Sequence, residues 1–133
     1  MEVLLASYEY SIWALGYVAA LMLVQLLVAD VVGIAKKHVP GTVVESNHSN
    51  ILFRTARTVG NVNESIGIFI CGLLFCLLTS ASPQYTAYAA WGYATSRTLY
   101  AVCYYANLQT LRSVVFGFSL LSLVALIVVG LLT

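Results

Sequence analysis

The chain of 133 residues has very few charged side chains, since Lys, Arg, Asp and Glu together make up only 8% of it. Soluble domains carry about a quarter charged residues and less than half apolar ones, whereas 61% of this chain is hydrophobic. This composition excludes a soluble enzyme and a disordered segment. The formal net charge of +1 also provides no basic surface for a nucleic acid, so no DNA or RNA partner is expected.

Cysteine and histidine are scarce as well. Cys71, Cys76 and Cys103 form no CxxC pair and lie in apolar runs, which favours buried thiols over a disulfide framework or a zinc site. His38 and His48 have no partner at metal-ligand spacing, so we expect solvated histidines and no metal site.

Long apolar runs are abundant instead. A helix that crosses the hydrocarbon core needs about 20 mostly apolar residues. The uncharged run between Glu9 and Asp30 is long enough for one span. The run 65–96 is too long for one span, and the turn-forming residues around Pro83 divide it between two helices. The sequence predicts four membrane spans, at roughly 10–35, 51–79, 84–107 and 112–132.

Basic residues flank the polar connection 36–50, and Arg112 begins the last predicted span on the same side. By the positive-inside rule this connection is cytoplasmic and both chain termini are non-cytoplasmic. No Lys or Arg precedes the first span, so it lacks the basic region of a cleaved signal peptide and is expected to stay as a helix. We therefore predict one all-α, multi-pass membrane domain over residues 1–133, a four-helix bundle in contact with membrane lipids.

Two polar stripes interrupt the apolar spans. They are Arg54, Arg57, Asn61 and Glu64 in the second predicted helix, and Tyr93, Arg97, Tyr100, Tyr104 and Asn107 in the third. Spacings of three and four residues place each set on one face of its helix. A charged group in a span is costly unless it faces protein or water. With Arg112 and Ser113 at the start of the fourth span, the stripes predict one hydrophilic cavity at the cytoplasmic end.

These charged residues also have purely structural interpretations. Arg54 and Arg57 lie near the interface, where they can snorkel or hold anionic headgroups. Arg97 and Glu64 can form an intramembrane ion pair that fixes helix register. Asp30 is expected to neutralise a neighbouring arginine.

Aromatic and small residues in the spans fit structural roles. Gly67, Gly72 and Gly92 suit close helix packing, which needs small side chains. Six aromatic residues fall at the outer ends of spans and are typical of an aromatic belt rather than a ligand site. They are Tyr8, Tyr10, Trp13, Tyr85, Tyr88 and Trp91.

Two motifs lie on the polar stripes. They are Arg57-Thr-Val-Gly-Asn61-Val-Asn-Glu64, of the form RxxxNxxE, and Arg97-Thr-Leu-Tyr100-Ala-Val-Cys-Tyr104, of the form RxxYxxxY. Both resemble signatures of the MAPEG family, the membrane-associated proteins in eicosanoid and glutathione metabolism, and the second is similar to a run in leukotriene C synthase. Arg112 resembles the arginine near the start of that family's fourth helix. The resemblance covers nearly the whole chain.

The resemblance implies a homotrimer of four-helix protomers that binds glutathione between neighbouring subunits. Arg112 would face the sulfur and act in catalysis, with Tyr104 as the hydrogen-bonding alternative. Together with Arg54 of the same stripe, the implied glutathione-binding set is Arg54, Arg57, Asn61, Glu64, Arg97 and Tyr100.

The implied chemistry is physically reasonable. A free thiol has a pKa of about 8.5, and the thiolate is the nucleophile. A guanidinium is always charged, so it can lower that pKa without itself titrating. Glutathione carries two carboxylates and an ammonium group, which several arginines and one glutamate complement in sign. The lipophilic second substrate would enter from the bilayer.

The sequence also departs from the family pattern. Val32 and Gly33 stand where several members have a basic residue, and Gly60 stands where prostaglandin E synthase has an arginine. Ile68 replaces the usual proline, and Phe116 replaces an aromatic hydroxyl. Because these positive charges are missing, a pocket that binds another thiol or a lipid remains an alternative.

Three functions are weighed on this basis. The first is a membrane-bound glutathione transferase that acts on lipophilic electrophiles, with peroxidase activity toward lipid hydroperoxides as a variant. The alternative is a non-catalytic MAPEG-like lipid-binding protein, which has little use for so many buried charges. A small four-span exporter is the weakest hypothesis, because the middle of the first span, 15–29, contains no acidic residue.

Overall fold

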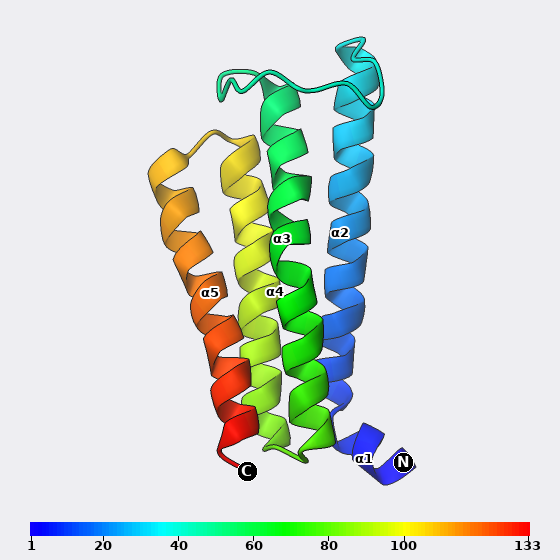
Figure 1. The fold of residues 1–133 in the computed structure, drawn as a ribbon, viewed down its shortest axis with the longest axis vertical. Helices are drawn as coiled ribbons and strands as arrows, with labels where there is room; N and C mark the ends of the chain where they lie inside the picture. Colours follow the sequence, from blue (N-terminus) through cyan, green and yellow to red (C-terminus); the bar gives the residue numbers. More distant parts are fainter.

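The computed structural model describes all residues, 1–133, and contains five helices and no strand. The helices are α1 (Glu2–Ser7), α2 (Glu9–Ala35), α3 (Ile51–Leu78), α4 (Pro83–Tyr105) and α5 (Gln109–Leu131). The four long helices, α2 to α5, run side by side, and the short α1 is turned aside at the N-terminal end (Figure 1). The expected all-α class is confirmed.

Each connection between long helices contains one non-glycine residue in the left-handed conformation. These residues are Lys37 (φ 55°), Ser80 (φ 54°) and Asn107 (φ 60°), and each lies two positions beyond the last residue of its helix. The next amide donates to a carbonyl five residues back, at 2.8 to 2.9 Å. This is the Schellman arrangement, which satisfies the free carbonyls at a helix end and reverses the chain sharply.

The apolar core lies in the half of the molecule near the two termini. Phe69 of α3 stacks on Tyr93 of α4 with ring centroids 4.4 Å apart, and alanines such as Ala14 and Ala90 let the helices approach. A smaller cluster of Tyr100, Tyr104 and Val115 lies toward the opposite end, where the 36–50 connection also lies. The polar side chains of the stripes belong to this second half.

Three helices are long and apolar enough to cross a membrane: Glu9–Ala35, Ile51–Leu78 and Gln109–Leu131. The expected span 84–107 corresponds to α4, which is helical but is not among the three, because Arg97 and many hydroxyl groups lower its hydropathy. α4 packs against α2, α3 and α5. Its polar groups are therefore covered largely by protein, which is the condition under which a membrane tolerates them.

Several expected positions differ in the structure. Tyr8 is not part of an exposed aromatic belt: it is only 2% exposed, and its hydroxyl donates to the carbonyl of Ala81. Cys76 and Cys103 are buried free thiols as expected, but Cys71 is exposed on the surface of this chain. Both differences have the same reason. The position of a residue in a helix predicts the face on which its side chain lies, but only the packing of the neighbouring elements decides whether that face is buried.

Candidate functional site

A polar cavity of about 330 Å³ lies between α3, α4 and α5 at the end of the helices that carries the 36–50 connection. It is lined by His48, Phe53, Arg57, Asn61, Tyr100, Tyr104, Arg112, Ser113 and Phe116. Five of the eight expected site residues are therefore brought together in its wall. The other three, Arg54, Glu64 and Arg97, lie behind it or beside it.

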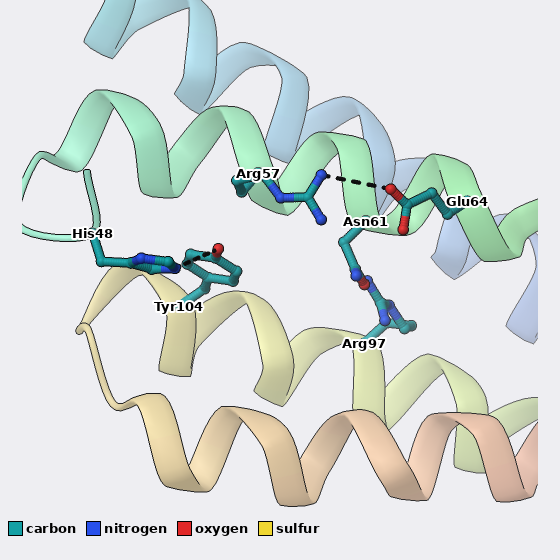
Figure 2. A network of polar contacts seen from close by, with 6 residues as sticks. All are labelled: His48, Arg57, Asn61, Glu64, Arg97 and Tyr104. Carbon is teal, nitrogen blue, oxygen red and sulfur yellow. Dashed lines mark hydrogen bonds and ion pairs between the residues drawn. The ribbon is translucent and has the colours of Figure 1, made fainter. Parts of the chain in front are cut away.

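Arg57 and Glu64 form the ion pair of the α3 stripe, with Nη1 and Oε1 3.5 Å apart (Figure 2). Their side chains are 40% and 64% exposed on this single chain. The alternative pairing of Glu64 with Arg97 is therefore wrong. Glu64 lies outside the cavity lining, and its carboxylate contacts the guanidinium of Arg57, which belongs to the lining.

Arg97 is completely buried and donates from Nη2 to Asn61 Oδ1 at 2.5 Å. Its guanidinium carbon lies 4.4 Å from the centroid of the Tyr100 ring, in cation–π geometry. An arginine can only donate hydrogen bonds, so the contact fixes the amide of Asn61. Asn61 Nδ2 is left as the group that can donate to an acceptor in the cavity.

Arg112, one turn into α5, lies over the ring of Tyr104, with its guanidinium carbon 4.5 Å from the ring centroid. Tyr100 contacts both Tyr104, at 5.5 Å between centroids, and Phe116, at 6.0 Å. The RxxYxxxY spacing places Tyr100 and Tyr104 on the cavity face of α4. The fourth-helix arginine then meets the second of these rings.

His48 is solvent-exposed, as expected, but it also lines the cavity, which the sequence did not reveal. Its Nε2 lies 3.3 Å from the hydroxyl of Tyr104, and the two rings are nearly parallel at 15°. Arg54 Nη1 donates to the carbonyl of His48 at 2.7 Å. Arg54 thus anchors the connection instead of lining the cavity. The one feature of the sequence that could have indicated His48 as a cavity residue is its position two residues before Asn50, which caps α3.

Asp30 does not neutralise an arginine, because the structure forms no ion pair at this residue and its one ion pair is that of Arg57 and Glu64. Asp30 instead lines a separate cavity of about 510 Å³ with Gly33 and His38, between the end of α2 and the start of α3. The two cavities contact different residues of α3: Leu52, Thr55 and Ala56 line the one beside Asp30, and Phe53, Arg57 and Asn61 line the polar one.

The electrostatics of the polar cavity favour an anion. Two guanidinium groups, Arg57 and Arg112, line it, and no carboxylate does. The amide of Asn61 and the tyrosine hydroxyls add hydrogen-bonding groups, while Phe53 and Phe116 provide apolar walls. No three His, Cys, Asp or Glu side chains converge anywhere in the chain, so the donor set suits an organic anion with an apolar part.

These features define an integral membrane protein with a polar cavity, lined by two arginines, at one end of its helices. A comparison with curated proteins gave no match. The MAPEG family, by contrast, matches residues 10–132, nearly the whole chain. The chain belongs to the MAPEG family, and this membership supports a membrane protein of glutathione or eicosanoid metabolism.

Proposed function

We propose that the protein is a membrane-bound glutathione transferase, of the type of the microsomal glutathione transferases and leukotriene C synthase. The observation that carries this proposal is the convergence of Arg57, Asn61, Tyr104 and Arg112 on one cavity. Glutathione would bind there as the thiol substrate. A lipophilic electrophile, or a lipid hydroperoxide in a peroxidase variant of the reaction, would be the second substrate.

Each polar group has a task in this reaction. Arg57 and the Nδ2 of Asn61 would bind the carboxylates and amides of glutathione, since charge-assisted hydrogen bonds to a guanidinium are strong and directional. Glu64, which is exposed beside Arg57 and outside the cavity lining, would bind the ammonium group of a glutathione molecule that extends beyond the cavity. Arg112 would stabilise the thiolate, with the Tyr104 hydroxyl as a hydrogen-bonding partner. The thiolate sulfur would then attack the electrophilic carbon. A C–S bond forms as the bond from that carbon to its leaving group, such as the C–O bond of an epoxide, breaks and its electron pair stays on the leaving atom.

The membrane arrangement belongs to the same proposal. We propose that α2, α3, α4 and α5 all cross the bilayer as one domain, with the 36–50 connection cytoplasmic and both termini on the opposite side. The two termini lie at one end of the molecule and the 36–50 connection at the other, which supports this topology (Figure 1). The phenylalanines of the cavity would receive a reactant that reaches it from the lipid.

We further propose that the functional unit is a homotrimer. Glu64 is 64% exposed near the middle of α3, and Asn63 beside it is also exposed. A charged side chain at the bilayer centre costs about 2.5–3.5 kcal/mol when it faces lipid. Contact with neighbouring copies would remove this cost, and a neighbour would also cover the exposed side of the Arg57–Glu64 pair.

The first experiment is a glutathione titration of the detergent-purified protein, followed by ultraviolet absorbance of the thiolate at neutral pH. We expect a saturable thiolate signal. A guanidinium within about 4–6 Å shifts a pKa by about 1–3 units, so Arg112→Leu is expected to lower the thiolate fraction and the turnover at least about tenfold. Lys36→Gln, which removes a positive charge outside the cavity, is the matched control and should behave as wild type.

Two results would contradict the proposal in different ways. An unchanged thiolate signal in Arg112→Leu would remove this residue from the mechanism. No binding of glutathione at millimolar concentration would favour the alternative, a non-catalytic MAPEG-like lipid-binding protein, and bound lipid would then be extracted and identified.

A further inference from the structure

His48 reaches the cavity from a connection and not from a helix, yet its position is well defined. Its backbone carbonyl accepts from Arg54, and Phe53 packs edge-on against its ring with centroids 4.9 Å apart. Its ring lies parallel to that of Tyr104, with centroids 6.0 Å apart and Nε2 3.3 Å from the hydroxyl. The imidazole is thus held at the boundary between the cavity and the surrounding water, because His48 itself remains solvent-exposed.

The cavity can stabilise a thiolate but has few places for the proton that the thiol loses. The charged groups that face His48 are Arg54 and Arg57 from α3 and Arg112 from α5, and all are cations. A guanidinium is permanently protonated and accepts no proton. The lining also has three hydroxyl groups, on Tyr100, Tyr104 and Ser113. A hydroxyl can relay a proton, but it does not retain an additional one. The imidazole of His48 is the one side chain in the lining with a basic ring nitrogen that can accept a proton.

We propose that His48 receives the glutathione thiol proton through the hydroxyl of Tyr104 and releases it to water. This inference rests on the proposed function. The S–H bond breaks and its electron pair stays on sulfur, beside Arg112. The thiol proton passes to Tyr104 Oη as the hydroxyl proton of Tyr104 passes to His48 Nε2. A neutral thiol and a neutral imidazole thereby become a thiolate and an imidazolium, which loses its proton to the solvent at the cavity mouth.

The structure explains why this route needs both residues. Tyr104 is buried, only 4% exposed, and packs against the guanidinium of Arg112, so this side chain has little contact with water. His48 is exposed to water, and it contacts the hydroxyl of Tyr104. The second histidine of the connection, His38, lines the separate cavity beside Asp30 and contacts Thr42. His38 is therefore a matched control within the same segment.

The test follows the rate of thiolate formation after rapid mixing of the full-length protein with glutathione, together with proton release to a pH indicator in weak buffer. Positioned acid–base groups contribute on the order of 10²-fold or more to proton transfer. We expect His48→Gln, which keeps a hydrogen-bonding side chain but has no basic nitrogen to take up a proton, to slow both signals by about this factor. The final amplitude of the thiolate signal should stay that of wild type, since Arg112 determines it. His38→Gln should leave the rate unchanged.

Chemical rescue separates a proton acceptor from a structural contact. Free imidazole should restore the rate in His48→Ala in proportion to its unprotonated form, and should not do so in His48→Gln, where the space is filled. A wild-type rate in His48→Gln, or no rescue of His48→Ala, would overturn the inference while the thiolate signal keeps the transferase proposal intact. Absence of any thiolate in wild type would overturn both.

Discussion

Asn61 is the residue at which the buried cation of the protein meets the cavity. Its Oδ1 accepts from the fully buried Arg97, whose Nε and Nη1 have no hydrogen-bond partner. A buried charge without an ionic partner is costly, and an amide together with the face of the Tyr100 ring compensates it only in part. The amide of Asn61 therefore serves two needs, since one end supports Arg97 and the other faces the ligand site.

Asn61→Asp separates these two needs. The carboxylate keeps an acceptor for Arg97 and supplies its missing counter-charge, so the unfolding midpoint in detergent should stay at or above that of wild type. The same change removes the Nδ2 donor and adds a negative charge beside the anion site. Hydrogen bonds that involve a charged group contribute about 1.5–3 kcal/mol, which corresponds to a rise of at least about tenfold in the Kd of glutathione.

Thermal unfolding and calorimetric titration of the same preparation measure both effects. Asn61→Ala is the companion variant: it removes both ends of the amide and should lower stability and affinity together. If Asn61→Asp bound glutathione as wild type does, the assignment of Nδ2 to the ligand would be wrong.

At the scale of the helices, close packing is concentrated at a few glycines in the half that holds the apolar core. A Cβ built at Gly130 of α5 would lie 2.5 Å from the ring of Phe75 on α3, and one at Gly72 would lie 3.3 Å from Leu126. A Cβ at Gly92 of α4 would meet Ser122 Oγ at 2.8 Å. Gly67, by contrast, has nothing within 4 Å, so its expected role in packing is not met within this chain.

Gly130→Ala is expected to destabilise the protein because the added methyl group overlaps the Phe75 ring. Overpacking of this kind costs about 1–3 kcal/mol. Gly117→Ala in the same helix is the control, because its Cβ would meet nothing within 4 Å, and alanine is favoured over glycine in a helix by up to about 1 kcal/mol. Chemical unfolding in a fixed detergent should therefore give a lower free energy of unfolding than wild type for Gly130→Ala only. Equal stability of the two would mean that α5 is not closely packed on α3 at this point.

At the scale of the whole molecule, the arrangement of the ends decides which compartment the cavity faces. The chain termini lie at one end and the 36–50 connection at the other (Figure 1). His48 of this connection lines the cavity. The proposed topology then opens the site to the cytoplasm, where glutathione would enter.

Cysteine labelling from either side of the membrane tests this topology. In a Cys71→Ser background the two remaining cysteines are buried. Val43→Cys, at a position that is 95% exposed, should react with an impermeant maleimide only from the cytoplasmic side. Glu2→Cys should react only from the opposite side. Labelling of both from the same side would contradict the predicted arrangement of the spans.

The proposed trimer is tested through Gly67, which lies on the exposed face of α3 near Glu64. We expect sedimentation equilibrium in density-matched detergent to give three times the protomer mass of 14.4 kDa. Gly67→Leu enters open space in the single chain, so any clash that it causes must come from another copy, and the mass should fall. A wild-type mass of one protomer would contradict the trimer, and an unchanged mass in Gly67→Leu would move the interface away from this face.

The local sequence determined the helices, their approximate ends and the two polar stripes. Apolar run length predicts a helix that matches the bilayer, turn-forming residues around Pro83 predict a break, and spacings of three and four fix which residues share a face. One group of cavity residues was therefore predictable, because each polar stripe lies on one face of its helix and all of them lie at the same end of the spans. This group is Arg57, Asn61, Tyr100, Tyr104 and Arg112.

Only the tertiary structure decided how these groups are paired. Glu64 meets Arg57 and not Arg97, Asn61 takes the place of a carboxylate beside Arg97, and His48 enters the cavity from a connection. Helical periodicity gives the direction of a side chain from its own axis, but not the rotation and depth of the neighbouring helix or the path of a connection. Those depend on the packing of all the helices at once, and so does the distance between any two charges on different elements.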